Sequence, residues 1–312
     1  MIKIKIECWW TDSNSIHQRI LKQFVFKEDL SKYQFVVSNP DYTIVLGRTE
    51  WDKLQTPKER TFYFSQEPLW SPNQPKEGIH NYCSKIFISD KRDYPNSKEY
   101  IETLLPMLYA GHGETDTRKE WDWSTDLKFS SFKKNKKMSI IVRKDHYPHY
   151  NHLVNSVTCN MNYELRTNLG IELSKNENID IYGTYWETNG KNIKGEVWNK
   201  HVGLDNYQFS IGCENSLQKN YITEKFWDII LTDCVPIYLG CTNIDELIPK
   251  NCFINLNNLT ISEMVKKIDD ILLNFEDYYH YYQKNIFDLK QDFFSNPSYN
   301  LWERIKLEIN NV

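Results

Sequence analysis

Short apolar segments that alternate with helical segments restrict the fold of this chain more than any other feature. In residues 1 to about 130 the expected strands are rich in β-branched or aromatic residues and end at polar or proline-containing turns. They are Ile2–Ile6, Gln34–Val37, Tyr42–Leu46, Thr61–Ser65 and Lys85–Ile88. Between the first two, Ile16, Ile20 and Phe24 recur at helical spacing. Strands separated by helices favour an α/β fold over an all-β fold.

A second block with the same alternation begins near residue 137. Its expected strands are almost continuously apolar, as parallel strands covered on both faces are; they are Lys137–Val142, Ile179–Tyr182, Gln208–Cys213 and Val235–Leu239. From Ile261 onward the apolar residues follow a helical period. We interpret residues 110–137, which include the basic run Lys133–Lys137, as the connection between the blocks. The pattern predicts an α/β protein of two Rossmann-like domains, residues 1–132 and 133–312, facing a cleft, with a helical C-terminus.

The composition of the chain excludes some classes of partner and indicates the cellular compartment. The net charge of −4 provides no basic field for gripping nucleic acid, so we expect no nucleic-acid partner. No apolar run approaches the roughly 20 residues of a membrane helix, so we expect no transmembrane segment. The seven cysteines are odd in number and include no C-x-x-C pair, which favours reduced thiols in a soluble cytoplasmic protein. Peripheral attachment to a membrane is the alternative.

The segment after the strand Gln208–Cys213 carries the clearest chemical signal. Glu214 and Asn215 follow the strand, a polar loop comes next, and Thr223 stands in a good N-cap position for an apolar helix. Lys225 in the first turn opposes the helix dipole unless an anion binds there, and phosphates commonly bind at helix N-termini. The pattern therefore predicts a diphosphate site with one carboxylate pointing near it. The alternative is that Glu224 and Lys225 are ordinary solvated residues of a first turn.

The same segment resembles the donor-site signature of the α-1,3/4-fucosyltransferase family (glycosyltransferase family 10), of bacterial or viral type. The resemblance rests on Glu214-Asn-Ser, Tyr221-Ile-Thr-Glu-Lys225 and Val235-Pro-Ile-Tyr-Leu-Gly240. Further similar segments are Arg166–Leu173, Asp180–Gly183 and, in the N-terminal half, Phe62–Pro68. The chain departs from the family pattern where Cys213 replaces a phenylalanine, where Arg143 and Lys144 replace Ser-Asn, and in an added stretch, His146–Glu164.

The resemblance implies a GT-B-type inverting glycosyltransferase, an α-1,3-fucosyltransferase. It would move L-fucose from GDP-β-L-fucose to a hydroxyl, O3 of N-acetylglucosamine, of an acceptor oligosaccharide or glycoconjugate. The N-terminal domain would bind the acceptor and the C-terminal domain the GDP-sugar, with no cofactor or metal required. Two alternatives remain. One is a transferase of the same fold that uses another nucleotide sugar, which the departures at Cys213 and Arg143 suggest; the other is a catalytically silent glycan-binding relative.

The resemblance also assigns roles to individual residues. Glu67 would be the catalytic general base, although a carboxylate before Pro68 can be an ordinary turn residue. Glu224, the second catalytic candidate, would contact the fucose hydroxyls or its developing charge. Lys225 and Arg166 would hold the diphosphate, because ammonium and guanidinium groups suit phosphate oxygens. The other donor-binding candidates are Asn215, Tyr221, Glu214, Tyr182 and Arg143.

Three histidines in one short run, His146, His149 and His152, raise the question of a metal. Their spacing, with Pro148 between them, fits neither a helix face nor a familiar zinc pattern. A surface loop, or a loop that contacts nucleotide or acceptor, is the better interpretation. No Asp-x-Asp pair follows an apolar strand, so we predict no metal site.

Overall fold

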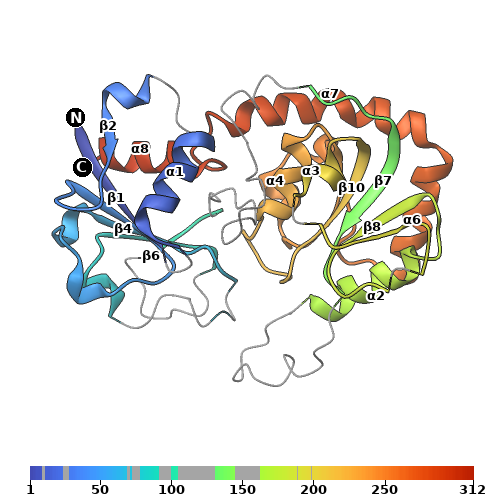
Figure 1. Ribbon diagram of the computed structural model, residues 1–312, viewed down its shortest axis with the longest axis horizontal. Helices are drawn as coiled ribbons and strands as arrows, with labels where there is room; N and C mark the ends of the chain where they lie inside the picture. Colours follow the sequence, from blue (N-terminus) through green and yellow to red (C-terminus); the bar gives the residue numbers. More distant parts are fainter. Residues whose placement is uncertain are drawn as a thin grey trace. The chain divides into compact units, whose positions relative to one another are not determined.

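The computed structural model describes residues 1–8, 11–23, 28–68, 71, 78–90, 100–104, 131–144, 162–187, 189–197 and 199–312. The chain divides into two compact units, and both contain a parallel sheet with helices packed on it (Figure 1). The described residues of Met1–Leu108 and the segment Phe293–Val312 belong to the first unit. Those of Lys128–Asp292 belong to the second.

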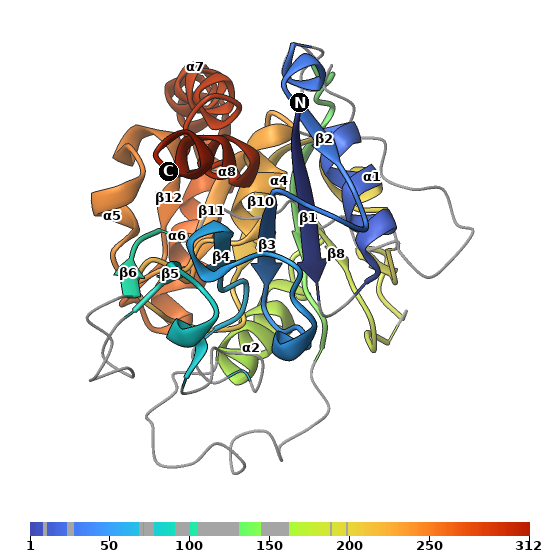
Figure 2. The same ribbon diagram turned by 90° about the vertical axis from the view of Figure 1, so that its left-hand side faces the viewer.

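The first sheet has the strand order β2-β1-β3-β4-β5-β6, which can be followed in Figure 2. All neighbouring strands are parallel. The strands are β1 (Ile2–Cys8), β2 (Tyr33–Phe35), β3 (Tyr42–Leu46), β4 (Thr61–Phe64), β5 (Lys85–Ile88) and β6 (Tyr100–Glu102), with helix α1 (Ser13–Gln23) between β1 and β2. All four residues of β4 are buried, as expected for a central strand covered on both faces. The predicted strands are thus present, while β6 was not predicted.

Helix α8 (Leu301–Asn310) belongs to the first unit, and Figure 1 shows it in red among the blue elements. Its Trp302 donates from Nε1 to Oδ2 of Asp29 at 2.9 Å and packs 5.2 Å from the ring of Phe35. Its Glu308 accepts a hydrogen bond of 2.7 Å from the ammonium of Lys85. The sequence pattern predicts, wrongly, that this helix belongs to the domain of residues 133–312. The apolar face of a helix indicates that it packs on a sheet but does not indicate which sheet.

The second sheet has the strand order β12-β11-β10-β7-β8-β9. The order along the chain reverses between β7 and β10, as in dinucleotide-binding α/β folds. The strands are β7 (Lys136–Ile141), β8 (Ile179–Tyr182), β9 (Ile193–Gly195), β10 (Tyr207–Cys213), β11 (Val235–Leu239) and β12 (Ile254–Asn255). The four strands predicted for this half are present, and the short strands β9 and β12 were not predicted.

Among the described residues of the second unit, the α-helices are α2 (Tyr163–Leu173), α3 (His201–Leu204), α4 (Glu224–Leu231), α5 (Ile244–Leu247), α6 (Ile261–Leu273) and α7 (Phe275–Phe293). Helix α4 packs on β10 and β11 and buries all of its residues except Lys225. Helix α6 begins at Thr260, whose side chain and that of Glu263 form a reciprocal capping box. None of the helices in the described part of the chain is both long and apolar enough to cross a membrane.

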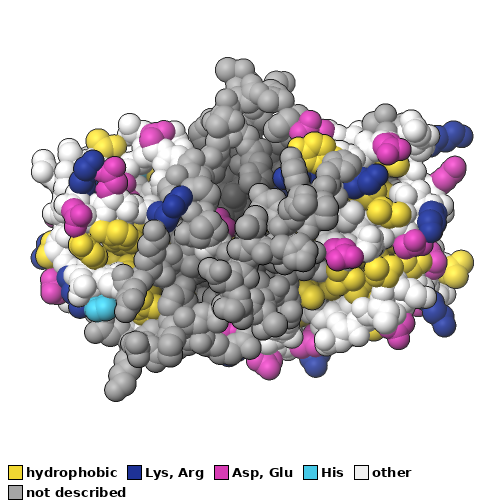
Figure 3. Space-filling view, turned by 90° about the horizontal axis from the view of Figure 1, so that it is seen from below, with side chains coloured by type: hydrophobic (Ala, Val, Ile, Leu, Met, Phe, Trp, Pro, Cys, Tyr) yellow, Lys and Arg dark blue, Asp and Glu magenta, His cyan; other side chains and the backbone are white. Residues whose placement is uncertain are grey.

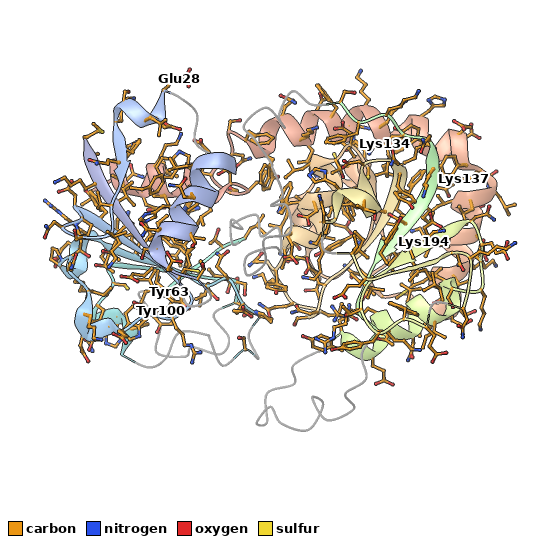
Figure 4. The ribbon with its side chains drawn as sticks, in the orientation of Figure 1. Glu28, Tyr63, Tyr100, Lys134, Lys137 and Lys194 are labelled. Carbon is orange, nitrogen blue, oxygen red and sulfur yellow. The ribbon has the colours of Figure 1, made fainter. Side chains whose placement is uncertain are left out.

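The basic run Lys133–Lys137 is part of the second unit rather than a solvated linker. Strand β7 begins at Lys136, and the ammonium of Lys134 binds the main-chain carbonyls of Asp205, at 3.0 Å, and Thr232. These carbonyls directly follow the last turns of α3 and α4, where a cation is favourable. Figure 4 labels Lys134 beside β7. Sequence alone could not place this lysine against helix ends that follow it by about 70 and 100 residues.

The six cysteines of the described chain are free thiols, and five of them are buried. Burial raises the pKa of Cys83 and of Cys213 to about 12, so both stay protonated at neutral pH. Cys159 lies outside the described residues. On the face shown in Figure 3, acidic and basic side chains are interspersed over the described surface, in keeping with the small net charge.

Candidate functional site

A cavity of about 170 Å³ lies at the carboxyl ends of β7 and β10. Ligands of open α/β sheets bind where the strand order reverses, and these two strands form that point in the second sheet. We call the cavity the switch-point pocket; its charged lining residues are Arg143, Arg166, Lys200, Glu224, Lys225 and Asp228. Four residues that the sequence analysis proposed as site residues therefore meet in one cavity.

The first turn of α4 is anchored by a buried carboxylate. Thr223 is the N-cap, as predicted, and its Oγ1 accepts from the backbone N–H of Lys225 at 3.3 Å. The backbone N–H of Thr223 donates to Oε1 of Glu214 at 2.7 Å, and its hydroxyl donates to Oε2 at 2.6 Å. The start of the helix is therefore held against the end of β10.

Glu214 is fully buried. It accepts a third hydrogen bond, of 3.2 Å, from the hydroxyl of Tyr238, and its Oε2 lies 3.6 Å from the ammonium of Lys225. Burial raises the pKa of Glu214, with Lys225 and the hydrogen bonds from Thr223 opposing the shift. The family resemblance implies that Glu214 binds the donor. Its burial and contacts make it instead a residue that positions Thr223 and Lys225.

Two glycines allow this close packing. A Cβ at Gly212 would lie 2.4 Å from the carbonyl oxygen of Lys225, so only a glycine in β10 lets the first turn of α4 come so near. A Cβ at Gly240 would lie 2.3 Å from Cγ of Glu214. Both contacts are far below van der Waals distance, so side chains at these positions would displace the helix or the carboxylate.

Lys225 places a permanent positive charge in the pocket. Its Nζ donates to Oε1 of Glu224 at 2.8 Å and to Oγ1 of Thr223 at 3.2 Å. Burial lowers the pKa of Lys225, but the carboxylates of Glu224 and Glu214 outweigh burial and the net pKa is raised. The side chain is only 24% exposed and that of Glu224 only 11%. The alternative of two ordinary solvated residues does not fit these contacts.

Arg166 reaches the pocket from α2, and only 6% of the residue is exposed. Its guanidinium lies 4.4 Å from the ring of Tyr163. Helix α2 packs close to the end of β7 because Gly170 makes room for Trp186. A Cβ at Gly170 would lie 2.8 Å from the ring of Trp186. Trp186 in turn donates from Nε1 to the carbonyl of Val142 at 2.7 Å. These contacts fix the helix that carries the arginine.

Arg143 is the second residue after the end of β7 and is exposed. Its guanidinium lies 5.0 Å from the ring of Tyr185, a residue after β8 with a φ of +66°. The neighbouring Lys144 ammonium lies 5.7 Å from the ring of Trp186. The two cations shortly after β7 therefore lie against aromatic side chains that follow β8.

Three other predicted donor-binding residues are not among the described lining of the pocket. The hydroxyl of Tyr221 donates to Oδ1 of Asn215 at 3.2 Å, and Tyr221 is only 3% exposed. Tyr182 is buried in an apolar cluster, with its hydroxyl 2.8 Å from that of Tyr207. Tyr182 thus belongs to the core, as a tyrosine at a strand end often does.

Glu67 lies in the first unit, three residues after the carboxyl end of β4, and is half-buried. This is the strand-end position at which the sequence analysis placed a general base. No group of three or more histidine, cysteine or acidic side chains able to hold a metal occurs within the described ranges. His146, His149 and His152 lie outside them.

Two charged lining residues were not foreseen. Lys200 precedes α3, and its ammonium lies 2.5 Å from Oδ2 of Asp228 and 3.9 Å from Oε1 of Glu224. Asp228 stands four residues after Glu224, and this spacing puts both residues on one face of α4. The spacing could therefore have identified Asp228 as a residue of the pocket. Lys200 carries no comparable signal in its own segment.

Solved structures of similar architecture define the class of fold. A crystal structure of an α1,3-fucosyltransferase is 17% identical and superposes with a TM-score of 0.52, over 92% of this chain and 80% of that one. A structure of an α1,3-fucosyltransferase with GDP-fucose gives a TM-score of 0.50 at 18% identity, over 93% and 80% of the two chains. The two Rossmann-like units thus form a fold of the GT-B type, as predicted.

Comparison of sequences leads to the family. Residues 148–302 match the family described as glycosyltransferase family 10 (fucosyltransferase), C-terminal part. The α-(1,3)-fucosyltransferase FucT of Helicobacter pylori is 22% identical over 283 residues, which are 82% of this chain and 54% of that protein. A putative fucosyltransferase-like protein of Arabidopsis thaliana is 32% identical over 96 residues, 30% of this chain and 18% of that protein. This chain belongs to glycosyltransferase family 10; its matches span about half or less of the length of these relatives.

Proposed function

We propose that this protein is an α-1,3-fucosyltransferase that moves L-fucose from GDP-β-L-fucose to O3 of N-acetylglucosamine in an acceptor glycan, with inversion at the anomeric carbon. The observation that carries the proposal is the meeting of Lys225, Arg166 and Glu224 in one cavity at the switch point of the second sheet. Family membership and a fold resembling a structure named with GDP-fucose support the choice of donor.

The pocket suits the diphosphate of such a donor. Lys225 and Arg166 supply charge-assisted hydrogen bonds to phosphate oxygens, and the first turn of α4 adds the positive end of its dipole. The cavity of about 170 Å³ is smaller than the roughly 300–1,000 Å³ of a complete small-molecule site, so it would hold the diphosphate and part of the sugar. Arg143 at its rim would add a further contact, and Asn215 and Tyr221 would orient the ribose or a phosphate.

The reaction then needs one proton acceptor and two charge stabilisers. Glu67 takes the proton of the acceptor hydroxyl, whose oxygen attacks the anomeric carbon of fucose from the face opposite GDP. The bond from that carbon to the β-phosphate oxygen breaks, and GDP leaves with the electron pair. Glu224 stabilises the oxocarbenium-like sugar, while Lys225 and Arg166 stabilise the charge on the departing diphosphate.

The two parts of the chain divide this work. Residues 1–132 would bind the acceptor oligosaccharide or glycoconjugate and carry Glu67. Residues 133–312 would bind GDP-fucose, except that α8 packs with the first unit. We propose that no divalent metal is required, because basic side chains supply the charge at the proposed diphosphate site. We also propose a cytoplasmic location, which the free thiols of the described chain favour.

The first measurement is a thermal melt with GDP, UDP, ADP and CMP. A ligand at 100 times its dissociation constant stabilises the folded protein by roughly 2.7 kcal/mol, which a melt detects. A shift with GDP alone supports the donor assignment. A shift with UDP instead would favour a transferase of the same fold that uses another nucleotide sugar.

The second measurement is turnover of GDP-fucose with N-acetyllactosamine as acceptor, with and without EDTA. We expect GDP release and an α-linked product, whose anomeric configuration and position NMR establishes. GDP binding without turnover on any acceptor of a glycan panel would favour the silent glycan-binding relative. Turnover abolished by EDTA and restored by Mg²⁺ would refute the metal-independent mechanism.

A further inference from the structure

Lys200 and Asp228 form a buried ion pair on the wall of the switch-point pocket. Nζ of Lys200 lies 2.5 Å from Oδ2 of Asp228, and the two side chains are 14% and 2% exposed. Lys200 comes from the segment before α3 and Asp228 from the second turn of α4, so the pair joins two elements across the pocket. Neither residue has a role in the mechanism above.

The position of Asp228 creates an electrostatic problem for Glu224. The two acids stand four residues apart on α4, a spacing at which like charges face each other and repel. Both residues are largely buried, 8% and 1% exposed, so water screens them poorly. Without a cation between them, the side chain of Glu224 would be driven away from the orientation it has in the pocket.

Lys200 is the cation that lies between these acids. Its ammonium is 2.5 Å from Asp228 and 3.9 Å from Oε1 of Glu224. The same oxygen of Glu224 accepts the 2.8 Å hydrogen bond from Lys225. Glu224 is thus held from two sides, by Lys225 of its own helix turn and by Lys200 from a different element.

We propose that Lys200 and Asp228 are positioning residues that set the orientation of Glu224 toward the transferring sugar; this rests on the proposed fucosyl transfer. A buried ion pair contributes little net stability compared with apolar residues of similar size. A role in orienting Glu224 accounts for the pair's place on the pocket wall. Asp228 in turn keeps the ammonium of Lys200 away from the diphosphate, which Lys225 and Arg166 would hold.

The test replaces the whole pair by apolar residues in the full-length protein, as Lys200→Met with Asp228→Leu. The double change removes one charge of each sign, so the net charge that attracts a diphosphate stays the same. In this variant Asp228 no longer repels Glu224, but Glu224 is held from one side only, by Lys225. We therefore expect kcat for GDP-fucose and N-acetyllactosamine to fall by up to about 100-fold, since small misplacements of catalytic groups cost that much. The dissociation constant of GDP, from calorimetry, should change little. Lys200→Arg, which keeps the cation, should lose much less kcat than the double variant.

A matched control removes another buried ion pair of the same unit. Lys290 is fully buried, and its ammonium lies 2.7 Å from Asp233, a pair that is not part of the pocket lining. The control variant is Lys290→Met with Asp233→Asn. Asparagine is chosen because it tolerates the φ of +59° at position 233. This control should change the melting temperature and leave kcat at the wild-type value.

If the wild-type protein transfers fucose, three results would overturn the inference. One is a folded Lys200→Met/Asp228→Leu variant with wild-type kcat; another is a loss of GDP affinity that matches the loss of kcat/KM, which would make Lys200 a diphosphate ligand. If the double variant does not fold, Asp228→Asn is measured in its place. The third result is an unchanged kcat in that variant. Wild-type protein that does not turn over GDP-fucose on any acceptor refutes the proposed function itself, and the inference with it.

Discussion

His17 is expected to make the first unit less stable in mild acid. Its side chain is almost completely buried on α1, and Nε2 accepts the backbone N–H of Ile6 in β1 at 3.1 Å. Burial lowers the pKa of His17 to about 4, and the positive charge of Lys5 adds to this shift. Protonation of Nε2 would turn the acceptor into a donor and leave two N–H groups facing each other, which costs the hydrogen bond and buries a charge.

The sign and size of the effect follow from the two pKa values. The unfolded chain takes up this proton near the ordinary pKa of 6.5, whereas the folded protein resists until about 4. The free energy of unfolding is therefore unaffected by His17 above that range and falls as the pH decreases through it. The loss is about 2 kcal/mol at pH 5 and about 3 kcal/mol once the pH is well below 4.

Urea unfolding at pH 7 and pH 5 tests this, with wild type compared with His17→Gln, whose amide oxygen can still accept the N–H of Ile6. Because other groups titrate too, the quantity of interest is the difference between the two proteins. Wild type should lose about 2 kcal/mol more than the variant between the two pH values. An NMR titration of the imidazole should place its pKa near 4. Equal losses in both proteins, or titration of His17 near 6.5, would refute the reasoning.

Three further changes probe the proposed site. Lys225→Ala should weaken GDP binding by about tenfold to a hundredfold, because a charge-assisted hydrogen bond is worth roughly 1.5–3 kcal/mol; unchanged affinity by calorimetry would leave Lys225 without a role in donor binding. Glu67→Gln should abolish transfer and leave GDP affinity nearly unchanged, and near-normal turnover would remove Glu67 from the mechanism. Gly240→Ala should lower the free energy of unfolding by about 1–3 kcal/mol, because the new Cβ would lie 2.3 Å from Cγ of Glu214 and 2.6 Å from the hydroxyl of Tyr238. Urea unfolding of that variant at wild-type stability would mean that the Glu214 side chain can move aside.

The best-predicted part of the molecule is the one whose signals are local. The strand before Glu214, the N-cap Thr223 and the helix that follows lie within about 25 contiguous residues, and each leaves its own pattern in the sequence. The near-continuous apolar strands likewise indicate a parallel sheet wherever they occur. The strands β6, β9 and β12 have only two or three residues each, too few for a period to be recognised. Strand β2 is as short, but the apolar run from Phe35 continues to Val37 and marks it in the sequence.

The features that sequence did not predict depend on distant contacts. Lys200 meets Asp228 across 28 residues, and no pattern around Lys200 marks it as a pocket residue. The burial of Glu214 beneath the pocket arises from the return of Tyr238 on the next strand. Tyr182 was predicted as a donor-binding residue, but its hydroxyl lies against that of Tyr207 in the core. The sequence around Tyr182 does not indicate which way this hydroxyl points.

The return of α8 to the first unit has a consequence for how the protein acquires its structure during synthesis. The first unit is discontinuous, with the described residues of Met1–Leu108 and the segment Phe293–Val312 separated by the second unit. At roughly 5–20 residues per second, the ribosome needs about 10–40 s to reach the closing segment. During that time the face that Trp302 later covers is exposed, so the nascent chain presents apolar surface to chaperones. The described residues of the second unit all lie within Lys128–Asp292, so this unit does not wait for a distant closing segment and can fold first, although its synthesis begins later.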